Sequence, residues 1–390
     1  MTATSRSRAV RFVILLGTVS LFADMTYEGA RSALGPFFVS LGASAAIVGT
    51  VSGAGELVGF ALRLFSGYIA DRTRAYWFLT IVGYGMNLLA VPALALAGRW
   101  EIAAALVIAE RTGKSIRTPA RDVMLSHATH EVGRGWGFGL HEALDQVGAV
   151  LGPLLVTVIL ARTHHFPTAF LALAIPAGLA LAVLLAARAQ YPAPQELEPK
   201  RLTFDTHGWS PVFWVYVAGA ALFAAGFVDF PLVAYHLEKQ QVIATGWILA
   251  LYSAAMAVEA GAALLFGRLY DRRGMSALPY AITVSLAALP LLFFGNAWAV
   301  FGGIACWAIG MGAQGATLRA GIATLTGADR RGSAYGVFNT VFGVAWFAGS
   351  ALMGRLYDRS VLALVVFGVA AQALSAAVFI VIAQRATSRR

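Results

Sequence analysis

The chain has 390 residues, of which 59% are hydrophobic and 12% are charged, and its formal net charge is +10. With a mean hydropathy of +0.72, it has too few polar groups to cover the surface of a water-soluble domain. These values exclude a soluble enzyme or binding module and indicate an integral membrane protein.

Apolar runs follow one another along the whole chain, and about twelve of them are long enough to cross a bilayer as helices. They begin near Phe12, Ala45, Phe78, Glu101, Gly137 and Phe166 in the first half, and near Pro211, Ile243, Ser276, Ala297, Gly332 and Val361 in the second. The first run continues past Asp24 and Glu28 without a small-residue cleavage site, so we expect a retained span and not a signal peptide.

Basic residues lie at alternate ends of the predicted spans, as the positive-inside rule requires of cytoplasmic loops. The main positions are Arg6, Arg72, Arg121, Lys200, Arg268, Arg330 and Arg389. We therefore expect a multi-pass protein of the plasma membrane, in a bacterium the inner membrane, with both termini in the cytoplasm. The positive charge reflects topology, so the expected partners are a small-molecule substrate and membrane lipids, with no nucleic acid, and the expected state is a monomer.

A proline-containing polar stretch, residues 190–210, separates two groups of spans and is predicted to be a cytoplasmic linker. Sequence echoes across it indicate that residues 1–189 and 211–390 are duplicated six-helix bundles. The clearest echo joins Gly67-Tyr-Ile-Ala-Asp71-Arg72 to Gly267-Arg-Leu-Tyr-Asp271-Arg272.

A third copy of this hexapeptide, Gly354-Arg-Leu-Tyr-Asp358-Arg359, ends the eleventh span on the opposite side of the membrane. An inverted repeat of three spans inside the second half predicts this placement. The predicted fold class is an all-α integral membrane protein with about twelve transmembrane helices in two pseudo-symmetric six-helix bundles.

With these repeats, the chain resembles the major facilitator superfamily over nearly its whole length, and in particular its drug/proton antiporter-like bacterial members. Residues 67–74 look like the family's cytoplasmic signature, G-x-x-x-D-R-x-G-R-R/K, but Ala75 and Tyr76 follow Arg74, whereas the second copy keeps its glycine at Gly274.

The resemblance implies a conformational latch at this signature. Asp71 would approach the start of span eleven, where the helix dipole favours a carboxylate. Arg72 would pair with Asp122 at the end of span four. The predicted latch residues are Gly67, Asp71, Arg72, Asp122, Asp271 and Arg272.

Span five contains Gly148-Ala-Val-Leu-Gly152-Pro153, which resembles the G-x-x-x-G-P core of the family's antiporter motif. The paired glycines expected after it are absent. Small residues at this spacing also let helices approach closely, so simple packing explains the same residues.

Span four contains Gly113-Lys114-Ser115, the last residues of a phosphate-binding loop, but Ile108 occupies the position of that loop's first glycine. A nucleotide site and a P-loop ATPase are therefore excluded. The span instead carries several charged residues, which must face protein or water because a charge facing lipid is costly.

The resemblance places Arg111 of span four opposite a protonatable acid of span one, with Glu28 first and Asp24 second, and Glu110 is added to this predicted proton-coupling set. Burial raises the pKa of a carboxyl group and a nearby guanidinium lowers it, so an acid whose arginine contact changes between two states can carry a proton. A static ion pair and direct contact with a charged substrate are the alternatives.

The remaining polar residues at this depth are predicted to line a substrate cavity. They are Tyr27, Arg31, Glu142 and Asp145 in the first half and Asp229, Gln314 and Asn339 in the second. Aromatic residues surround the second set, which suits an organic substrate with apolar surface.

Histidine pairs occur at His127 and His130, near Glu131, and at His164 and His165, but neither pair has the spacing of a metal motif. We expect no metal, no cofactor and no enzymatic activity, and a proton gradient as the energy source. The sequence thus predicts a secondary transporter that exports a small organic compound in exchange for protons. Proton-coupled uptake, and export of a lipid or a divalent metal ion, are the alternatives.

Overall fold

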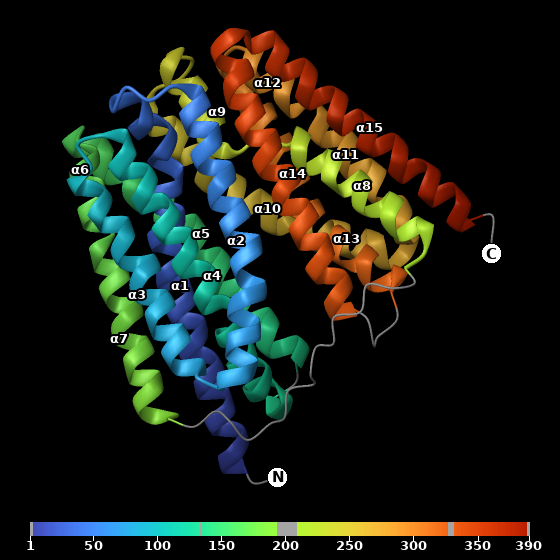
Figure 1. The fold of residues 1–390 in the computed structure, drawn as a ribbon. Coiled ribbons are helices and arrows are strands. Elements are labelled where there is room, and N and C mark those ends of the chain that lie inside the picture. The colour runs from blue at the N-terminus through green and yellow to red at the C-terminus, as the bar shows by residue number, and fades with distance from the viewer. Residues whose placement is uncertain (1–2, 133, 193–208, 327–330, 388–390) are drawn as a thin grey trace. The chain divides into compact units, whose positions relative to one another are not determined.

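The computed structural model describes residues 3–132, 134–192, 209–326 and 331–387. Side chains are not described for 3–9, 64, 71, 126–132, 134–138, 323, 331–333 and 385–387. In the first half the helices are α1 (Ala3–Ser40), α2 (Ala45–Thr73), α3 (Tyr76–Ala93), α4 (Trp100–Val132), α5 (Arg134–Thr163), α6 (Phe166–Ala172) and α7 (Ala174–Gln190). In the second half they are α8 (Pro211–Gly226), α9 (Phe230–Lys239), α10 (Thr245–Arg273), α11 (Ala277–Leu286), α12 (Ala288–Phe294), α13 (Ala297–Leu325), α14 (Arg331–Arg359) and α15 (Val361–Thr387) (Figure 1).

Ten segments of the described chain are long and apolar enough to cross a membrane. One of them, Thr245–Phe294, contains 50 residues and holds α10, α11 and α12, which are separated after α10 by a short 3-10 turn, Gly274–Ser276. Helix α4 has 33 residues but is absent from the ten because its charges interrupt every apolar window. Ten segments are found instead of the predicted twelve spans because Thr245–Phe294 contains two of the predicted spans and because α4 is not among the ten.

The contacts divide the chain into two compact units. Unit 1 comprises Met1–Phe37 and Val58–Arg201, and unit 2 comprises Phe38–Leu57 and Leu202–Arg390. The tip of the α1–α2 hairpin therefore belongs to unit 2, although the rest of both helices belongs to unit 1. Most of the predicted linker lies outside the described residues, so the linker stays a prediction.

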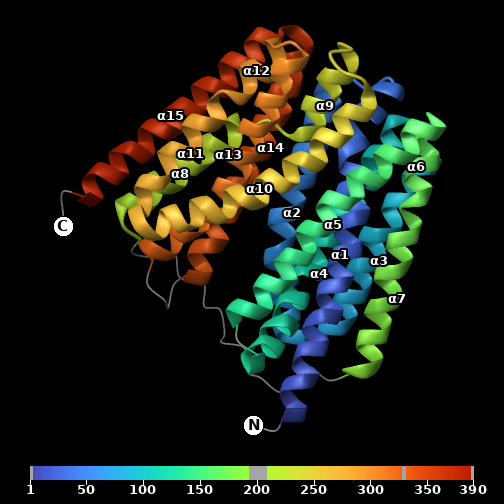
Figure 2. The same ribbon diagram turned by 180° about the vertical axis from the view of Figure 1, so that it is seen from behind.

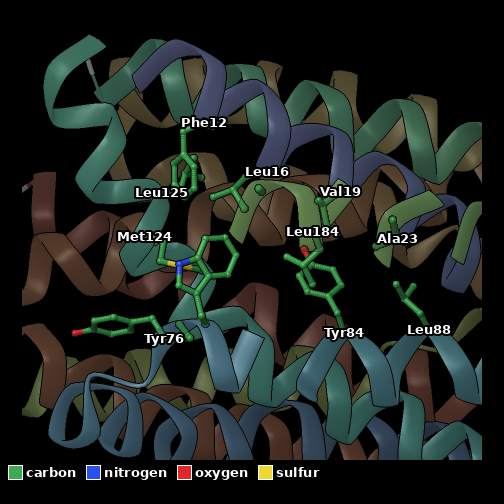
Figure 3. Packing of buried hydrophobic residues seen from close by; sticks show 14 of the residues in the cluster. Phe12, Leu16, Val19, Ala23, Tyr76, Tyr84, Leu88, Met124, Leu125 and Leu184 are labelled. Carbon is green, nitrogen blue, oxygen red and sulfur yellow. The ribbon is translucent and has the colours of Figure 1, made fainter. Parts of the chain in front are cut away.

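The described apolar core of unit 1 is built mainly by α1, α3, α4 and α7, and α2 adds Ala70 (Figure 3). Phe12, Leu16 and Val19 project from one stripe of α1. Val19 lies near Tyr84 of α3 and Leu184 of α7, whereas Phe12 packs on Trp77 of α3 with the ring centroids 6.2 Å apart. The spacing of three to four residues on α1 puts these side chains on one face, as expected of an amphipathic contact stripe.

In unit 2, α8 contacts α14 and α15, and α15 also contacts α11. Helices α10 and α13 lie side by side in both views (Figures 1 and 2). The predicted seventh span is not one helix, because α8 and α9 are separated by Phe227, Val228 and Asp229.

The end of α10 shows why the repeated signature keeps a glycine in one copy. Gly274 has a φ of 59°, in the left-handed region that favours glycine. Arg74 holds the equivalent place in the first copy, seven residues after Gly67, and it has a φ of 53°. The first copy thus also has a positive φ at this position, on a residue that is disfavoured there.

We expect Gly274→Ala to lower the unfolding free energy by about 1 to 2 kcal/mol, the cost of a side chain in left-handed backbone. The measurement is thermal unfolding of the purified protein in detergent. Gly267→Ala is the matched control, since a Cβ at Gly267 meets nothing within 4 Å. Equal melting temperatures for the two variants would contradict the assignment of strain to position 274.

Candidate transport site

Polar side chains of α1 and α4 face each other in an order that suits two antiparallel helices. The Arg121 guanidinium donates a 3.1 Å hydrogen bond to the Ser20 hydroxyl. Two turns away, the Lys114 ammonium lies 3.7 Å from the centre of the Tyr27 ring. We call this contact the α1–α4 seam, which comprises Ser20, Asp24, Tyr27, Glu28 and Arg31 of α1 and Glu110, Arg111, Lys114, Arg117 and Arg121 of α4.

Lys114 is the central cation of the seam. Its charge is attracted by Glu28 and Asp24 and repelled by Arg111. Its position over the Tyr27 ring adds a cation–π contact, worth about 2 kcal/mol when desolvated. Sequence reasoning did not include Lys114 among the site residues, although it lies on the same face as Arg111, one turn further along α4.

Arg111 and Glu110 form a separate charged pair within the seam. The Arg111 Nε lies 3.4 Å from Glu110 Oε2, and the Asn87 amide donates a 2.7 Å hydrogen bond to Glu110 Oε1. A buried carboxylate needs such partners to offset the loss of water. Asn87 was not predicted, although an asparagine inside an apolar membrane run is itself a sign of a buried contact. A pairing of Arg111 with Glu28 or Asp24 stays a prediction.

Helix α5 adds His141 and Asp145 to the end of the seam near Ser20. The Ser20 hydroxyl lies 3.2 Å from His141 Nε2, and Asp145 Oδ2 lies 3.7 Å from the same nitrogen. A nucleophilic triad instead has the acid on the other ring nitrogen of the histidine. These three residues therefore do not form a catalytic triad. Asp145 is also a charged neighbour of Asp24, so α5 completes an acidic side of the seam.

Arg117 is the most buried cation of the seam, with 1% of its surface exposed. Its guanidinium carbon lies 4.1 Å from the centre of the Tyr84 ring. Its Nε and Nη1 atoms are buried and have no hydrogen-bond partner in the described part of the chain. A buried donor without an acceptor costs about 1 to 3 kcal/mol, so this side chain gains free energy in any state that supplies an acceptor. Asp24 is a charged neighbour of Arg117.

A small cavity opens at the other end of the seam. It is lined by Tyr27, Arg31, Glu110 and Arg111 together with apolar residues of α1, α3 and α4. Its volume of about 20 Å³ has room for a water molecule but not for an organic solute. Two of the predicted cavity residues, Tyr27 and Arg31, line it, whereas Glu142 is exposed on α5.

Glycines let the neighbouring helices of unit 1 approach the seam. A Cβ at Gly83 of α3 would lie 2.7 Å from the Gly113 carbonyl oxygen of α4. A Cβ at Gly152 of α5 would lie 2.9 Å from the Gly29 amide nitrogen of α1. The glycine of Gly113-Lys114-Ser115 and those of the antiporter-like motif therefore serve close packing in this structure.

We expect Gly83→Ala to destabilise the protein by about 1 to 3 kcal/mol, because the added methyl group must push α3 and α4 apart. Thermal unfolding in detergent measures the effect. Gly85→Ala is the control on the same helix, as nothing lies within 4 Å of its Cβ position. A Gly83→Ala protein as stable as the Gly85→Ala protein would contradict close packing of α3 on α4.

In unit 2, the predicted residue Asp229 lies at the break between α8 and α9 and is 2% exposed. Gly226 precedes the break and Pro231 follows in the first turn of α9, where a proline is tolerated but disfavours helix before it. The carboxylate accepts hydrogen bonds from Trp346 Nε1, at 3.1 and 3.0 Å, and from the Ser350 hydroxyl, at 2.8 Å.

Aromatic rings surround this break. Phe227 and Phe230 each contact Trp307, at centroid distances of 5.9 and 5.7 Å. Trp307 Nε1 donates a 2.8 Å hydrogen bond to the Val228 carbonyl oxygen. The unwound backbone is therefore held by side-chain donors in place of helical hydrogen bonds.

The other two predicted residues of unit 2 are partly buried. The Gln314 side chain donates to the Met311 sulfur at 2.9 Å and lines a cavity of about 10 Å³. Asn339 lies on α14, two turns from Trp346. A common site of Asp229, Gln314 and Asn339 stays a prediction.

Arg72 and Asp122 have other partners in this structure, so the expected latch pair between them stays a prediction. Arg72 donates to the Tyr68 hydroxyl at 2.8 Å, and Asp122 pairs with Arg121 at 2.8 Å. The reason is local, since each partner is adjacent or one turn away on the same helix. The Asp71 side chain lies outside the described residues, and Asp271 and Arg272 are exposed at the end of α10.

The side chains of His127, His130 and Glu131 also lie outside the described residues. His165 of the second pair approaches the Thr168 hydroxyl at 3.3 Å. Where side chains are described, no group of three His, Cys, Asp or Glu is arranged to hold a metal ion.

Comparison with known proteins identifies the family. The model described as Major Facilitator Superfamily matches residues 16–350. The chain belongs to the major facilitator superfamily. Its charged α1–α4 seam is therefore part of a membrane transporter of that superfamily, and the protein is not an enzyme.

Relatives in the superfamily span nearly the same length. An uncharacterised protein of Mycobacterium tuberculosis is 42% identical over 374 residues, which cover 94% of this chain and 91% of that protein. An MFS-type transporter of Methanocaldococcus jannaschii is 27% identical over 373 residues, which cover 89% of each.

Solved structures show the same fold at low identity. The nucleoside transporter NupG has a TM-score of 0.75 at 14% identity, with 95% of this chain and 98% of that chain covered. The peptide transporter POT in complex with sulfate has a TM-score of 0.77 at 12% identity, with 97% and 94% covered. A bacterial homologue of the lysosomal transporter Spinster has a TM-score of 0.72 at 15% identity, with 98% of each covered. At these identities the likeness concerns the fold alone.

Proposed function

We propose that this superfamily member is a proton-coupled exporter of a small organic compound, and that the α1–α4 seam carries the proton. The observation behind the proposal is the pair of buried carboxyl groups on α1 beside Lys114 of α4, which is partly buried. Asp24 is 8% and Glu28 is 7% exposed, and both act on the charge of Lys114.

The coupling follows from charge compensation. Isolated charges are costly inside a membrane protein, so the seam is stable only while its acids and bases balance. A motion that separates α1 from α4 leaves Asp24 and Glu28 with less compensation, and each then favours its protonated form. Return of Lys114 favours release of the proton. The seam thereby links proton binding to conformation.

Arg117 supports this exchange as a second cation. In the present state it packs on Tyr84, and its Nε and Nη1 atoms have no acceptor in the described part of the chain. A carboxylate or an anionic part of a substrate can fill that need in the alternate state. Loss of this contact again changes the charge balance next to Asp24.

An organic substrate suits unit 2 because aromatic rings surround Asp229. Similarity to a nucleoside transporter and a peptide transporter supports compounds of that size as first candidates. Export is preferred because the Gly148–Pro153 segment resembles an antiporter motif. Uptake is the second candidate, and lipid or divalent metal export follows. No cofactor, a monomeric state, the bacterial inner membrane and cytoplasmic termini are part of the proposal.

The first experiment finds the substrate and tests coupling. Purified protein is screened by thermal shift at two pH values against nucleosides, small peptides, organic cations and divalent metal ions. A compound that stabilises the protein is then added to proteoliposomes containing a pH-sensitive dye. Substrate movement that drives proton movement in the opposite direction supports export by antiport. Movement of both in one direction indicates uptake, and equilibration without proton movement would refute coupling.

We expect Glu28→Gln to reduce proton-driven flux at least about tenfold, a change of about 1.4 kcal/mol, because an amide cannot exchange the proton. Thermal shift should still detect the substrate. Glu101→Gln is the control, since Glu101 lies in the first turn of α4 and pairs with Arg99 at the exposed end of that helix. Unchanged coupling in Glu28→Gln and in Asp24→Asn would contradict the seam as the proton carrier.

A further inference from the structure

The α1–α2 hairpin tip, residues 38–57, belongs to unit 2, while the remainder of α1 and α2 belongs to unit 1. Any motion between the units must therefore bend these helices or detach the tip. The contacts that hold the tip within unit 2 decide which of these occurs.

A carboxylate from α14 holds the start of α2. Asp358 accepts hydrogen bonds from the backbone N–H groups of Ala45, at 3.1 Å, and Ala46, at 2.8 Å. Ser44 caps the same helix from within, since its hydroxyl accepts from the Ile47 amide at 3.3 Å. Three of the N–H groups that a helix start leaves open are thus satisfied, two of them by another helix.

A tyrosine from α9 holds the residue before the cap. The Tyr235 hydroxyl donates a 3.0 Å hydrogen bond to the Ala43 carbonyl oxygen. Lys239 donates to the same hydroxyl at 3.2 Å, and its charge also acts on Asp358. Side chains of α9 and α14 therefore both hydrogen-bond to the backbone of the tip.

Below the cap, α2 and α14 pack without intervening side chains. A Cβ at Gly49 would lie 3.0 Å from Gly354 Cα and would also meet the Ser350 carbonyl oxygen. A Cβ at Gly53 would lie 2.9 Å from Ser350 Cβ. Small residues at such positions let two helices approach closely.

We propose that Asp358 is a conformational clasp, which holds the hairpin tip on unit 2 in this state and releases it when the transporter turns to face the other side. The clasp consists of Asp358, Tyr235 and the backbone of residues 43–46. This inference rests on the proposed transport cycle. It gives a role to the third copy of the repeated hexapeptide, Gly354–Arg359, which the predicted latch does not use.

The chemistry of the clasp suits a switch. A carboxylate at a helix N-terminus is a moderate electrostatic contact, and both partners can be hydrated when it opens. Opening exposes two N–H groups that water can satisfy at the membrane surface. The glycines let α2 and α14 approach closely, and Asp358 adds an electrostatic attraction to the N-terminus of α2.

The test measures the distance between the tip and α15 without a substrate. Spin labels are placed at Ser40→Cys and Leu362→Cys, two exposed positions, with the free Cys306 replaced by serine. Pulsed electron resonance on protein in lipid nanodiscs then gives the distance distribution. In the parent protein we expect a dominant short distance.

Asp358→Ala is expected to raise the long-distance population roughly fivefold, the size of effect typical of a lost charged helix cap. Asp358→Asn should fall between the two. Arg355→Gln is the matched charge control on α14, because Arg355 is exposed, and it should leave the distribution unchanged. Distributions of Asp358→Ala and parent protein that superimpose would overturn the clasp.

A second variant covers the possibility that Asp358→Ala fails to fold. Gly49→Ala should also shift the population to the long distance, with Gly59→Ala as its control on the same helix, since nothing lies within 4 Å of that Cβ position. An unshifted Gly49→Ala distribution would contradict the clasp. These distances require no substrate and no proton gradient, so their failure is distinct from failure of proton-coupled transport, which the flux assay of Glu28→Gln detects.

Discussion

The contact between the charged faces of α1 and α4 constrains the rest of unit 1. Buried carboxylates and cations are tolerated there only if they stay close together, because each loses several kcal/mol of hydration free energy when it leaves water. The helices can approach closely only where a small residue faces the neighbouring backbone, and glycines occupy these positions. Gly83 and Gly113 bring α3 against α4, and Gly29 and Gly152 bring α5 against α1.

The two units solve the problem of buried polarity differently. Unit 1 sets acids against bases, with Lys114 between Asp24, Glu28 and the Tyr27 ring. Unit 2 holds Asp229 with the neutral donors Trp346 and Ser350 at a helix break. Discontinuous helices at membrane depth are tolerated where other groups satisfy the freed backbone. In the proposed function, the paired charges of unit 1 carry the proton and the aromatic residues of unit 2 contact the organic solute.

Much of the fold was predictable because membrane spans depend on local composition. The spans expected to begin at Ala45, Phe166 and Pro211 begin there as α2, α6 and α8. The break in the seventh span was not predicted, since Gly226 and Pro231 are common in membrane helices and do not by themselves show that Trp307 replaces the lost hydrogen bond.

The candidate site was predictable as a set of residues but not as a set of pairs. Hydropathy identified α4 as the charged span, and helical spacing grouped Asp24, Tyr27, Glu28 and Arg31 on one face. Which cation meets which acid depends on the register between α1 and α4. A shift of about one turn would exchange the places of Lys114 and Arg111, which the sequence alone does not decide. The Arg72–Asp122 pair stays a prediction, because in this structure Asp122 pairs with the adjacent Arg121.

The central claim is that the α1–α4 seam contains a carboxyl group that takes up and releases a proton. Infrared difference spectroscopy of the protein in lipid, recorded between acidic and neutral pH, observes this directly without a known substrate. The account predicts a carboxyl C=O band that appears at acidic pH and disappears in the Asp24→Asn/Glu28→Gln double variant. A difference spectrum in which that band persists unchanged in the double variant would contradict it.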